Sequence, residues 1–310
     1  MSKLNKILFI SYGGGHVNML KPAYDLLSKN KSYDLHYLAL TTAQNILKKQ
    51  KIPFFGFKDI INNNLEVLKN GQELLKTLKF DVVDKEESVA YLGLSFWDLV
   101  QKHGAEEAQS LYARKGRGAF LPTLVMEEFL KTFKPGLLIT TNSPRAEKAA
   151  LLSAKRLGIP SICISDHYTA SEIEDRLKIS GYGSKICVSL PIAKKKLIEA
   201  GRPAEEIVVT GNPAFDHYGD ITKVPHEIKT ILWARTPKEK DQEGSDKTES
   251  ILLALCEKNN WKLVIRLHPN EDKSYEPHKN LEISTHKLDC LLYTSPSPRD
   301  ATLSRMPSSA

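Results

Sequence analysis

The sequence has no hydrophobic run that approaches the roughly 18 residues of a membrane-spanning helix. Its first residues, MSKLNKILFISY, have a basic start but no small-residue cleavage site of a signal peptide. Cysteine is scarce, with no CxxC pair and no histidine at zinc-finger spacing. We therefore expect a cytoplasmic protein whose cysteines are reduced and structural, namely Cys163, Cys187, Cys256 and Cys290.

Nucleic-acid-binding signatures are missing as well, since no RNP-like, KH-like or zinc-finger pattern occurs. The chain has 310 residues and a net charge of +7, which suits an anionic partner such as a nucleotide or a phospholipid. Its hydrophobic content of 41% and charged content of 26% are ordinary for a globular protein. At roughly 150 residues per domain, this length predicts two domains.

The last segment, CLLYTSPSPRDATLSRMPSSA (290–310), shows neither helical nor strand periodicity. It resembles the conceptual translation of a transposon-type sequencing adapter, followed by an index and a flow-cell primer. A disordered tail is the alternative interpretation. We expect a non-native tail at 290–310, and a natural protein that continues differently after Asp289. Without this tail the net charge is +6, so the basic balance remains.

Strand-like and helix-like segments alternate along the rest of the chain. Apolar runs such as KILFISY and PGLLITTN are typical of buried parallel strands, and VNMLKPAYDLLSKN has an apolar helical face. IPFFGF is predicted to be a short strand, and residues 60–133 are predicted to be mainly helical. The pattern predicts an α/β protein with a doubly wound parallel sheet, whose ligands bind beyond the carboxyl ends of the strands.

The glycine-rich stretch YGGGHVNML follows the first predicted strand and opens a helix. Glycines allow a tight turn and close approach of a ligand, and a helix amino end attracts anions. The stretch is not a dinucleotide fingerprint, because Asn18 stands where GxGxxG needs its last glycine. It also lacks the GKS or GKT of a Walker loop. A strand-to-helix turn without a ligand is the alternative interpretation.

GGGHVNMLKPAYDLL resembles the N-terminal loop of GT-B glycosyltransferases, in particular the lipid-linked N-acetylglucosaminyltransferases of peptidoglycan assembly and the diacylglycerol galactosyltransferases. ICVSLPIAKKKLIEAGRPAEEIVVTGNPAFD is similar to the passage by which many GT-B chains enter their nucleotide domain. LVIRLHPNED resembles a second-domain strand of GT-B transferases and of sugar-nucleotide 2-epimerases. These motifs together span most of residues 7–271.

The resemblance implies a GT-B fold of two Rossmann-like domains, the second incomplete. An acceptor-binding domain is expected at 1–210 and a partial nucleotide-sugar-binding domain at 211–289. The resemblance implies an inverting, metal-independent glycosyltransferase that uses no cofactor. It would transfer a sugar from a nucleotide-sugar, expected to be UDP-linked, to a cell-envelope or surface-glycan acceptor. In several GT-B families the histidine of the loop acts as base or contacts the acceptor, and that residue is His16 here. A neutral imidazole can accept the proton of an acceptor hydroxyl as the glycosidic bond forms.

Further candidate residues lie mostly at predicted strand ends. TTNSPRAE could equally be a helix start with Ser143 as its N-cap. Arg235 could hold a diphosphate through a bidentate contact or be a solvated arginine. No metal site is expected. The substrate-binding candidates are Gly13, Gly14, Gly15, Asn18, Asn142, Ser143, Arg145, Asp166 and His167, and the donor-binding candidates are Asn212, Arg235, Thr236 and His268.

The basic stretch LYARKGRGAF could touch anionic lipid if the acceptor is membrane-bound, although a solvated loop is the simpler interpretation. The expected partners are thus a nucleotide-sugar donor, a glycan or lipid-linked acceptor and, as an option, the inner face of the membrane. No nucleic-acid partner is expected.

Two other functions stay open. A sugar-nucleotide 2-epimerase shares the fold, but such enzymes open with a GTRPE-like motif after the first strand, where this chain has YGGGHVN. The third possibility is a non-catalytic nucleotide-sugar-binding fragment, which leaves the activity of the 310-residue chain itself open.

Overall fold

The structure, a computed structural model, describes residues 5–61, 64–76, 84–166, 182–218, 229–235, 242–267 and 273–284. The chain divides into two compact units, the first reaching His217 and the second covering Tyr218–Asp289. Each unit is described by itself below. Three predicted site residues and the predicted non-native tail lie outside the described residues, namely His167, Thr236, His268 and 290–310.

A six-stranded parallel sheet forms the centre of the first unit, in the order β2-β1-β3-β4-β5-β6. Its central strands are apolar on both faces because helices cover both faces. In β1, Leu8 and Ile10 join one hydrophobic cluster, whereas Ile7 and Phe9 join another. The strands are β1 (Lys6–Ser11), β2 (Asp34–Ala39), β3 (Leu137–Thr141), β4 (Ser161–Ile164), β5 (Lys185–Val188) and β6 (Ile207–Val209).

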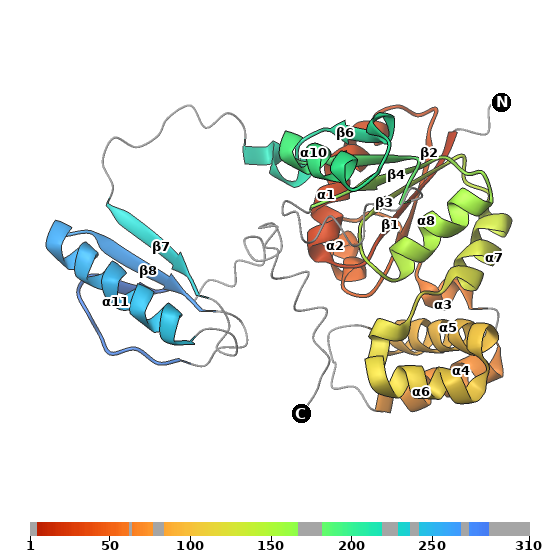
Figure 1. Cartoon of the computed structure of the whole chain (residues 1–310), viewed down its shortest axis with the longest axis horizontal. Coiled ribbons are helices and arrows are strands. Elements are labelled where there is room, and N and C mark those ends of the chain that lie inside the picture. The colour runs from red at the N-terminus through yellow and green to blue at the C-terminus, as the bar shows by residue number, and fades with distance from the viewer. Residues whose placement is uncertain are drawn as a thin grey trace. The chain divides into compact units, whose positions relative to one another are not determined.

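The two clusters correspond to two layers of helices (Figure 1). One layer contains α1 (Gly14–Ser28) and α2 (Ala43–Lys49), which bury Val17, Leu20 and Leu47. The other layer contains α7 (Thr123–Phe133), α8 (Ala146–Arg156) and α10 (Pro191–Glu199). Helices on both faces of a parallel sheet make this unit doubly wound, which confirms the predicted fold class.

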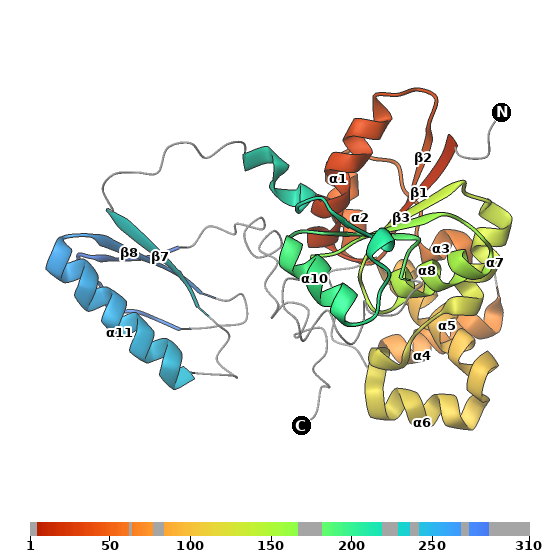
Figure 2. The same cartoon turned by 45° about the horizontal axis from the view of Figure 1, so that its top comes forward.

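A helical segment is inserted between β2 and β3, and its helices α4, α5 and α6 lie together in both views (Figures 1 and 2). Helix α5 is almost entirely buried between Val89 and Leu99, whereas Lys85 and Glu86 at its start are exposed. The segment comprises α3 (Phe57–Ile60), α4 (Leu65–Lys76), α5 (Lys85–His103), α6 (Ala105–Lys115) and the short 3₁₀ helix η2 (Gly116–Ala119). Two further 3₁₀ turns, η3 (Ala204–Glu206) and η4 (Pro213–Tyr218), flank β6.

The predicted short strand IPFFGF is wrong. The structure has a single parallel bridge there, between Leu38 and Phe55, and α3 begins at Phe57. The physical reason is the buried Glu87 carboxylate, which accepts hydrogen bonds from the Phe57 and Lys58 backbone N–H groups and so stabilises a helix start.

The second unit has a three-stranded parallel sheet in the order β7-β8-β9 and one described helix. Its buried hydrophobic cluster is small and centres on Cys256, Leu263 and Ile265. The stretch LVIRLHPNED, which resembles a second-domain strand, contains the end of β8, whereas the three-residue β9 was not predicted. The elements are β7 (Thr230–Ala234), α11 (Gln242–Asn259), β8 (Lys262–Arg266) and β9 (Leu281–Ile283).

The cysteines of the described residues are free, with Cys163 and Cys256 buried and Cys187 half-buried. Within the same residues, no helix combines the length and the apolar character that crossing a bilayer requires.

Candidate functional site

The strand order places a topological switch point between β1 and β3. The chain passes from β1 outward to β2 and then returns to the other side of β1 to form β3. In open parallel sheets a crevice forms at the carboxyl ends of two such strands, and ligands bind there. His16 follows β1, Thr141 is the last residue of β3 and Glu147 follows it, so the predicted glycine loop and the TTNSPRAE stretch meet at this point.

His16 lies in the first turn of α1 and is hydrogen-bonded through Nδ1 to the hydroxyl of Thr141. The Thr141 hydroxyl in turn donates to Glu147 Oε2, at 2.5 Å. Because its hydrogen is directed at the carboxylate, the Thr141 oxygen accepts from Nδ1–H of His16. This chain of donors fixes the Nδ1–H tautomer and leaves the Nε2 lone pair of His16 free to accept a proton.

Glu147 is a candidate site residue that sequence reasoning missed. It is fully buried in the first turn of α8, and its Oε1 accepts a 2.6 Å hydrogen bond from the Tyr12 backbone N–H. Its Oε2 accepts from the Ser143 backbone N–H at 3.1 Å as well as from Thr141. The only sequence signal was an acidic residue on the apolar-rich helix AEKAALLSAKR, three positions after a proline.

The Glu147 carboxylate also sets the charge state of His16, since its Oε1 lies 3.6 Å from Nδ1. Burial of the imidazole would lower its pKa, but the charge of Glu147, with a smaller contribution from Asp166, raises the pKa above its ordinary value. The imidazolium that forms when Nε2 accepts a proton is therefore stabilised in place. A histidine arranged in this way is suited to general base catalysis.

The backbone conformation of the turn before α1 does not require the glycines. Gly13 is the N-cap of α1 with a φ of −144°, an extended conformation that any residue adopts. A Cβ at Gly13 would meet only the Thr42 hydroxyl, at an ordinary 3.6 Å. Together with Gly14 and Gly15 it leaves the amino end of α1 without side chains, which suits a helix end that faces an anion. Asn18 is half-buried two positions after His16 on the same helix.

The carboxyl ends of β3 and β4 hold the next predicted residues. Asn142 is buried, and its side-chain amide donates to the Ser165 hydroxyl at 3.4 Å. The Tyr182 hydroxyl donates to the carbonyls of Asn142 and Ser143 at 3.2 Å. Ser143 is not the N-cap of the following helix, because α8 begins only at Ala146. These contacts hold residues 142–143 at the carboxyl end of β3, and the half-buried Asp166 contributes to the raised pKa of His16.

Arg145 lies at the amino end of α8, and only 8% of its surface is exposed. Its guanidinium carbon lies 4.8 Å from the centre of the Tyr12 ring. Tyr12 thus contacts Arg145 through its ring and Glu147 through its backbone. The switch point therefore brings together the predicted residues Gly13, Gly14, Gly15, His16, Asn18, Asn142, Ser143, Arg145 and Asp166.

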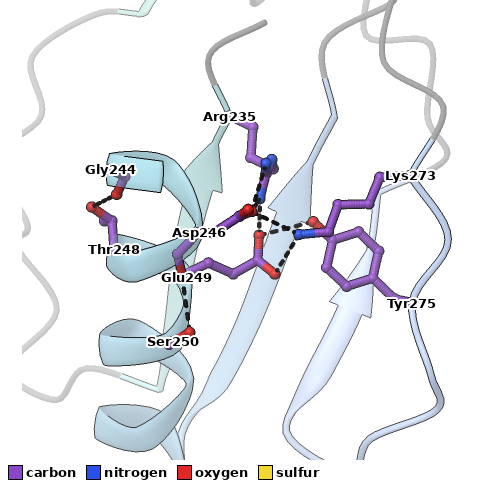
Figure 3. A network of polar contacts seen from close by, with 8 residues as sticks. All are labelled: Arg235, Gly244, Asp246, Thr248, Glu249, Ser250, Lys273 and Tyr275. Atoms are coloured by element: carbon purple, nitrogen blue, oxygen red, sulfur yellow. Dashed lines mark hydrogen bonds and ion pairs between the residues drawn. The ribbon is translucent and has the colours of Figure 1, made fainter. Parts of the chain in front are cut away.

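In the second unit, Arg235 follows β7 and is held by acidic residues of α11 (Figure 3). It forms ion pairs with Glu249 and with Asp246, the latter at 3.1 Å, and these carboxylates raise its pKa even though burial opposes this. Lys273 also contacts both carboxylates, and the Tyr275 hydroxyl donates to Glu249 at 2.9 Å. A diphosphate at Arg235 would have to compete with two carboxylates.

The remaining donor-binding candidate, Asn212, belongs to the first unit. Its side-chain oxygen accepts from the Ala214 backbone N–H at 3.0 Å, which shapes the turn into η4. The described part of the chain contains no group of three or more His, Cys, Asp or Glu residues that could hold a metal ion.

No protein-family model matches this sequence, and no curated protein matches it. Solved structures are similar to it in three dimensions. A UDP co-structure of MnaA from S. aureus has 14% identity and a TM-score of 0.50, covering 86% of this chain and 62% of that one. A UDP-GlcNAc 2-epimerase from Neisseria meningitidis bound to UDP-GlcNAc has 15% identity and a TM-score of 0.51, with coverage of 86% and 66%.

A UDP-GlcNAc 2-epimerase from Methanocaldococcus jannaschii has 13% identity and a TM-score of 0.50, covering 85% of this chain and 66% of that one. The chain thus spans less than two thirds of the length of these three structures. At such low identity the similarity shows the fold alone, which is the α/β fold of GT-B type that the sequence predicted.

Proposed function

We propose that this protein is a nucleotide-sugar-dependent glycosyltransferase in which His16 is the general base. The observation that carries the proposal is the chain His16–Thr141–Glu147 at the switch point, which leaves Nε2 as the proton acceptor. As the acceptor oxygen bonds to the anomeric carbon, its proton passes to Nε2 and the nucleoside diphosphate leaves. The donor is proposed to be UDP-linked, because similar proteins have been solved in complex with UDP or UDP-GlcNAc.

In this proposal the first unit binds the acceptor, a glycan or lipid-linked glycan of the cell envelope, and the second unit binds the donor. The amino end of α1, free of side chains at Gly13 to Gly15, offers backbone N–H groups to a phosphate. Neither a metal nor a cofactor takes part. If His16 is not the base, Asp166, which follows β4, is the next candidate for the proton acceptor.

A sugar-nucleotide 2-epimerase is the second candidate, favoured by the names of the Neisseria and Methanocaldococcus structures. The two activities differ in their need for an acceptor. NMR of UDP-GlcNAc incubated with the enzyme alone would show the 2-epimer if the protein is an epimerase. A transferase releases UDP in proportion to added glycan acceptor, and a non-catalytic binding fragment does neither.

The test of the base is His16→Ala, assayed in the natural gene product if residues 290–310 derive from an adapter. Turnover should fall about 10²–10⁴-fold, the contribution of a positioned base, while nucleotide-sugar binding changes little. His16→Asn retains a polar group of similar reach but cannot accept a proton near pH 7, so it should be nearly as impaired. The control is His36→Asn, on β2 beside Asp34. If His16→Asn turned over at nearly the wild-type rate while Gly14→Val was inactive, the loop would bind its ligand only through its backbone. His16 would then not be the base.

A further inference from the structure

Thr41, in the turn between β2 and α2, has a backbone φ of +52°, which lies in the left-handed region. Residues other than glycine rarely adopt this conformation, and it is least favourable for β-branched side chains such as threonine. Three other non-glycine residues in the described part of the chain share it, but each stands at the end of a helix, where a left-handed residue is ordinary, namely Lys51, Lys134 and Asn260. Thr41 instead precedes a helix, so its conformation needs another cause.

Hydrogen bonds fix the backbone on both sides of Thr41. The Leu40 N–H donates to the Ser11 carbonyl at 2.9 Å, one step beyond the last pair of the β1–β2 ladder. The Gln44 N–H donates to the Thr41 carbonyl at 3.3 Å. The Thr41 hydroxyl donates to the Tyr12 carbonyl at 2.5 Å. A strained residue persists where its surroundings fix it, and such residues gather at functional sites, so the contact with Tyr12 is the one to follow.

Tyr12 connects Thr41 to the candidate site. Its carbonyl accepts from Thr41, its N–H donates to Glu147 Oε1 at 2.6 Å, and its ring lies 4.8 Å from the Arg145 guanidinium carbon. The same Oε1 lies 3.6 Å from Nδ1 of His16. The Tyr12 N–H and the His16 ring therefore face one carboxylate oxygen. Because the N–H donor offsets part of the negative charge of this oxygen, the position of Tyr12 decides how much of that charge acts on the imidazole.

We propose that Thr41 is a positioning residue of the candidate site, because its hydroxyl fixes the backbone of Tyr12. Tyr12 in turn holds the Glu147 carboxylate where it orients the His16 ring. The charged groups that act on His16 are Glu147 and Asp166, and both remain in a Thr41 variant, so such a variant changes position and not charge. The consequence for turnover rests on the proposed function of His16 as the base, whereas the effect on the His16 ring does not.

The experiment is an NMR titration of the His16 ring in the 310-residue chain, with the resonance identified by its loss in His16→Asn. Thr41→Val keeps the shape and the β-branch of threonine but removes the hydroxyl that holds Tyr12. A loosened Tyr12 N–H leaves more of the Glu147 charge to stabilise the imidazolium, so the His16 pKa should rise above its wild-type value. Thr41→Ser keeps the hydroxyl and should titrate as the wild type does.

Thr41→Gly separates the hydroxyl from the strain. Glycine adopts the left-handed conformation without a steric penalty but has no hydroxyl, so the His16 pKa should rise while the melting temperature exceeds that of Thr41→Val. The matched control is Lys134→Gly, at the end of α7, where φ is also +52°. It relieves a similar strain and should leave the His16 titration unchanged.

A His16 pKa that stays constant or falls in Thr41→Gly would overturn the proposal, and so would an equal rise in Thr41→Ser or Lys134→Gly. These variants decide the matter even if Thr41→Val does not fold. In the natural gene product, turnover should fall about tenfold in Thr41→Gly and be retained in Thr41→Ser, because a displaced catalytic group loses rate. A raised His16 pKa in Thr41→Gly without sugar transfer by the wild type would contradict only the proposed function.

Discussion

At the residue scale, one buried carboxylate organises the candidate site. Glu147 accepts hydrogen bonds from the ends of β1 and β3 and lies beside His16, so a single side chain joins two loops that are more than a hundred residues apart. Its first-turn position on α8 adds the positive end of a helix dipole to these donors. The orientation, tautomer and charge of His16 all depend on it.

The first prediction concerns the pH profile. His16 accepts a proton only when neutral, so the rate should fall as the pH drops through its raised pKa. Glu147→Gln removes the carboxylate that raises this pKa, and burial then lowers it, so the acidic limb should move to lower pH. The measurement is kcat/KM against pH, with an NMR titration of the His16 ring. An unchanged His16 pKa in Glu147→Gln would refute the assignment.

The same coupling predicts a pH-dependent stability. The folded-state pKa of His16 is raised, so the stability that its pairing with Glu147 contributes is fully present below the unfolded value of about 6.5. It is lost as the pH rises through the folded-state pKa. Urea unfolding at pH 5.5 and pH 8.5 should therefore show a larger difference for the wild type than for His16→Asn. Equal differences would show that the pair adds nothing to folding.

Thr141→Val tests the relay between His16 and Glu147. Valine preserves the shape but removes the hydroxyl that accepts from His16 and donates to Glu147. We expect turnover to fall at least about tenfold and stability to fall by about 1–3 kcal/mol, because a buried carboxylate loses a donor. Thr141→Ser restores the hydroxyl and should retain most of both. If valine and serine behave alike, the hydroxyl has no role.

At the scale of elements, α4 and α5 approach each other closely through two glycines. A Cβ on Gly71 would lie 2.1 Å from the Val89 carbonyl oxygen, and a Cβ on Gly93 would lie 2.1 Å from that of Val67. The contact is reciprocal, and its shortest distances are to backbone atoms, which cannot move aside as a flexible side chain can. These glycines therefore serve the packing of the helical segment.

Gly71→Ala and Gly93→Ala should each destabilise the protein by about 1–3 kcal/mol, although alanine favours the helix itself, because the inserted methyl group overpacks the contact. Chemical denaturation monitored by circular dichroism measures the loss. Gly118→Ala is the control, since its Cβ would meet only Lys115 Cβ, at 4.0 Å. Stabilisation by either helical substitution would contradict the close contact.

At the scale of the whole molecule, the chain divides into units with very unequal cores. The first unit reaches His217 and contains two large hydrophobic clusters, whereas the second has one small cluster around Cys256, Leu263 and Ile265. The second unit also exposes large apolar side chains, among them Leu232 and Ile251. Stability follows buried apolar area, so the two units should differ in stability.

We expect two thermal transitions in the 310-residue chain, with the second unit melting first. The three tryptophans allow this to be measured, because Trp97 lies in the first unit and Trp233 and Trp261 lie in the second. Fluorescence of Trp97→Phe should report only the lower transition, and circular dichroism should report both. One cooperative transition by both probes would show that the units fold together.

The sequence by itself determined the class of the fold. Alternating buried strands and amphipathic helices predict a doubly wound parallel sheet, because a strand apolar on both faces needs a helix on each side. The same pattern located His16 and the loop after β3 at strand ends. It failed at IPFFGF, where hydrogen bonds to the Glu87 side chain stabilise a helix start. It also failed at β9, which is too short to show a strand period.

Only the tertiary structure decided which side chains meet. Glu147 looks in the sequence like any surface acid of a helix, whereas Arg145 is a substrate-binding candidate only through its place after a predicted strand. Burial at the switch point gives Glu147 three backbone and hydroxyl donors beside His16, and places the Arg145 guanidinium 4.8 Å from the centre of the Tyr12 ring. Arg235 is likewise held by Asp246 and Glu249. Local periodicity encodes the faces of helices and strands, whereas hydrogen bonds and ion pairs between distant residues depend on how those elements pack.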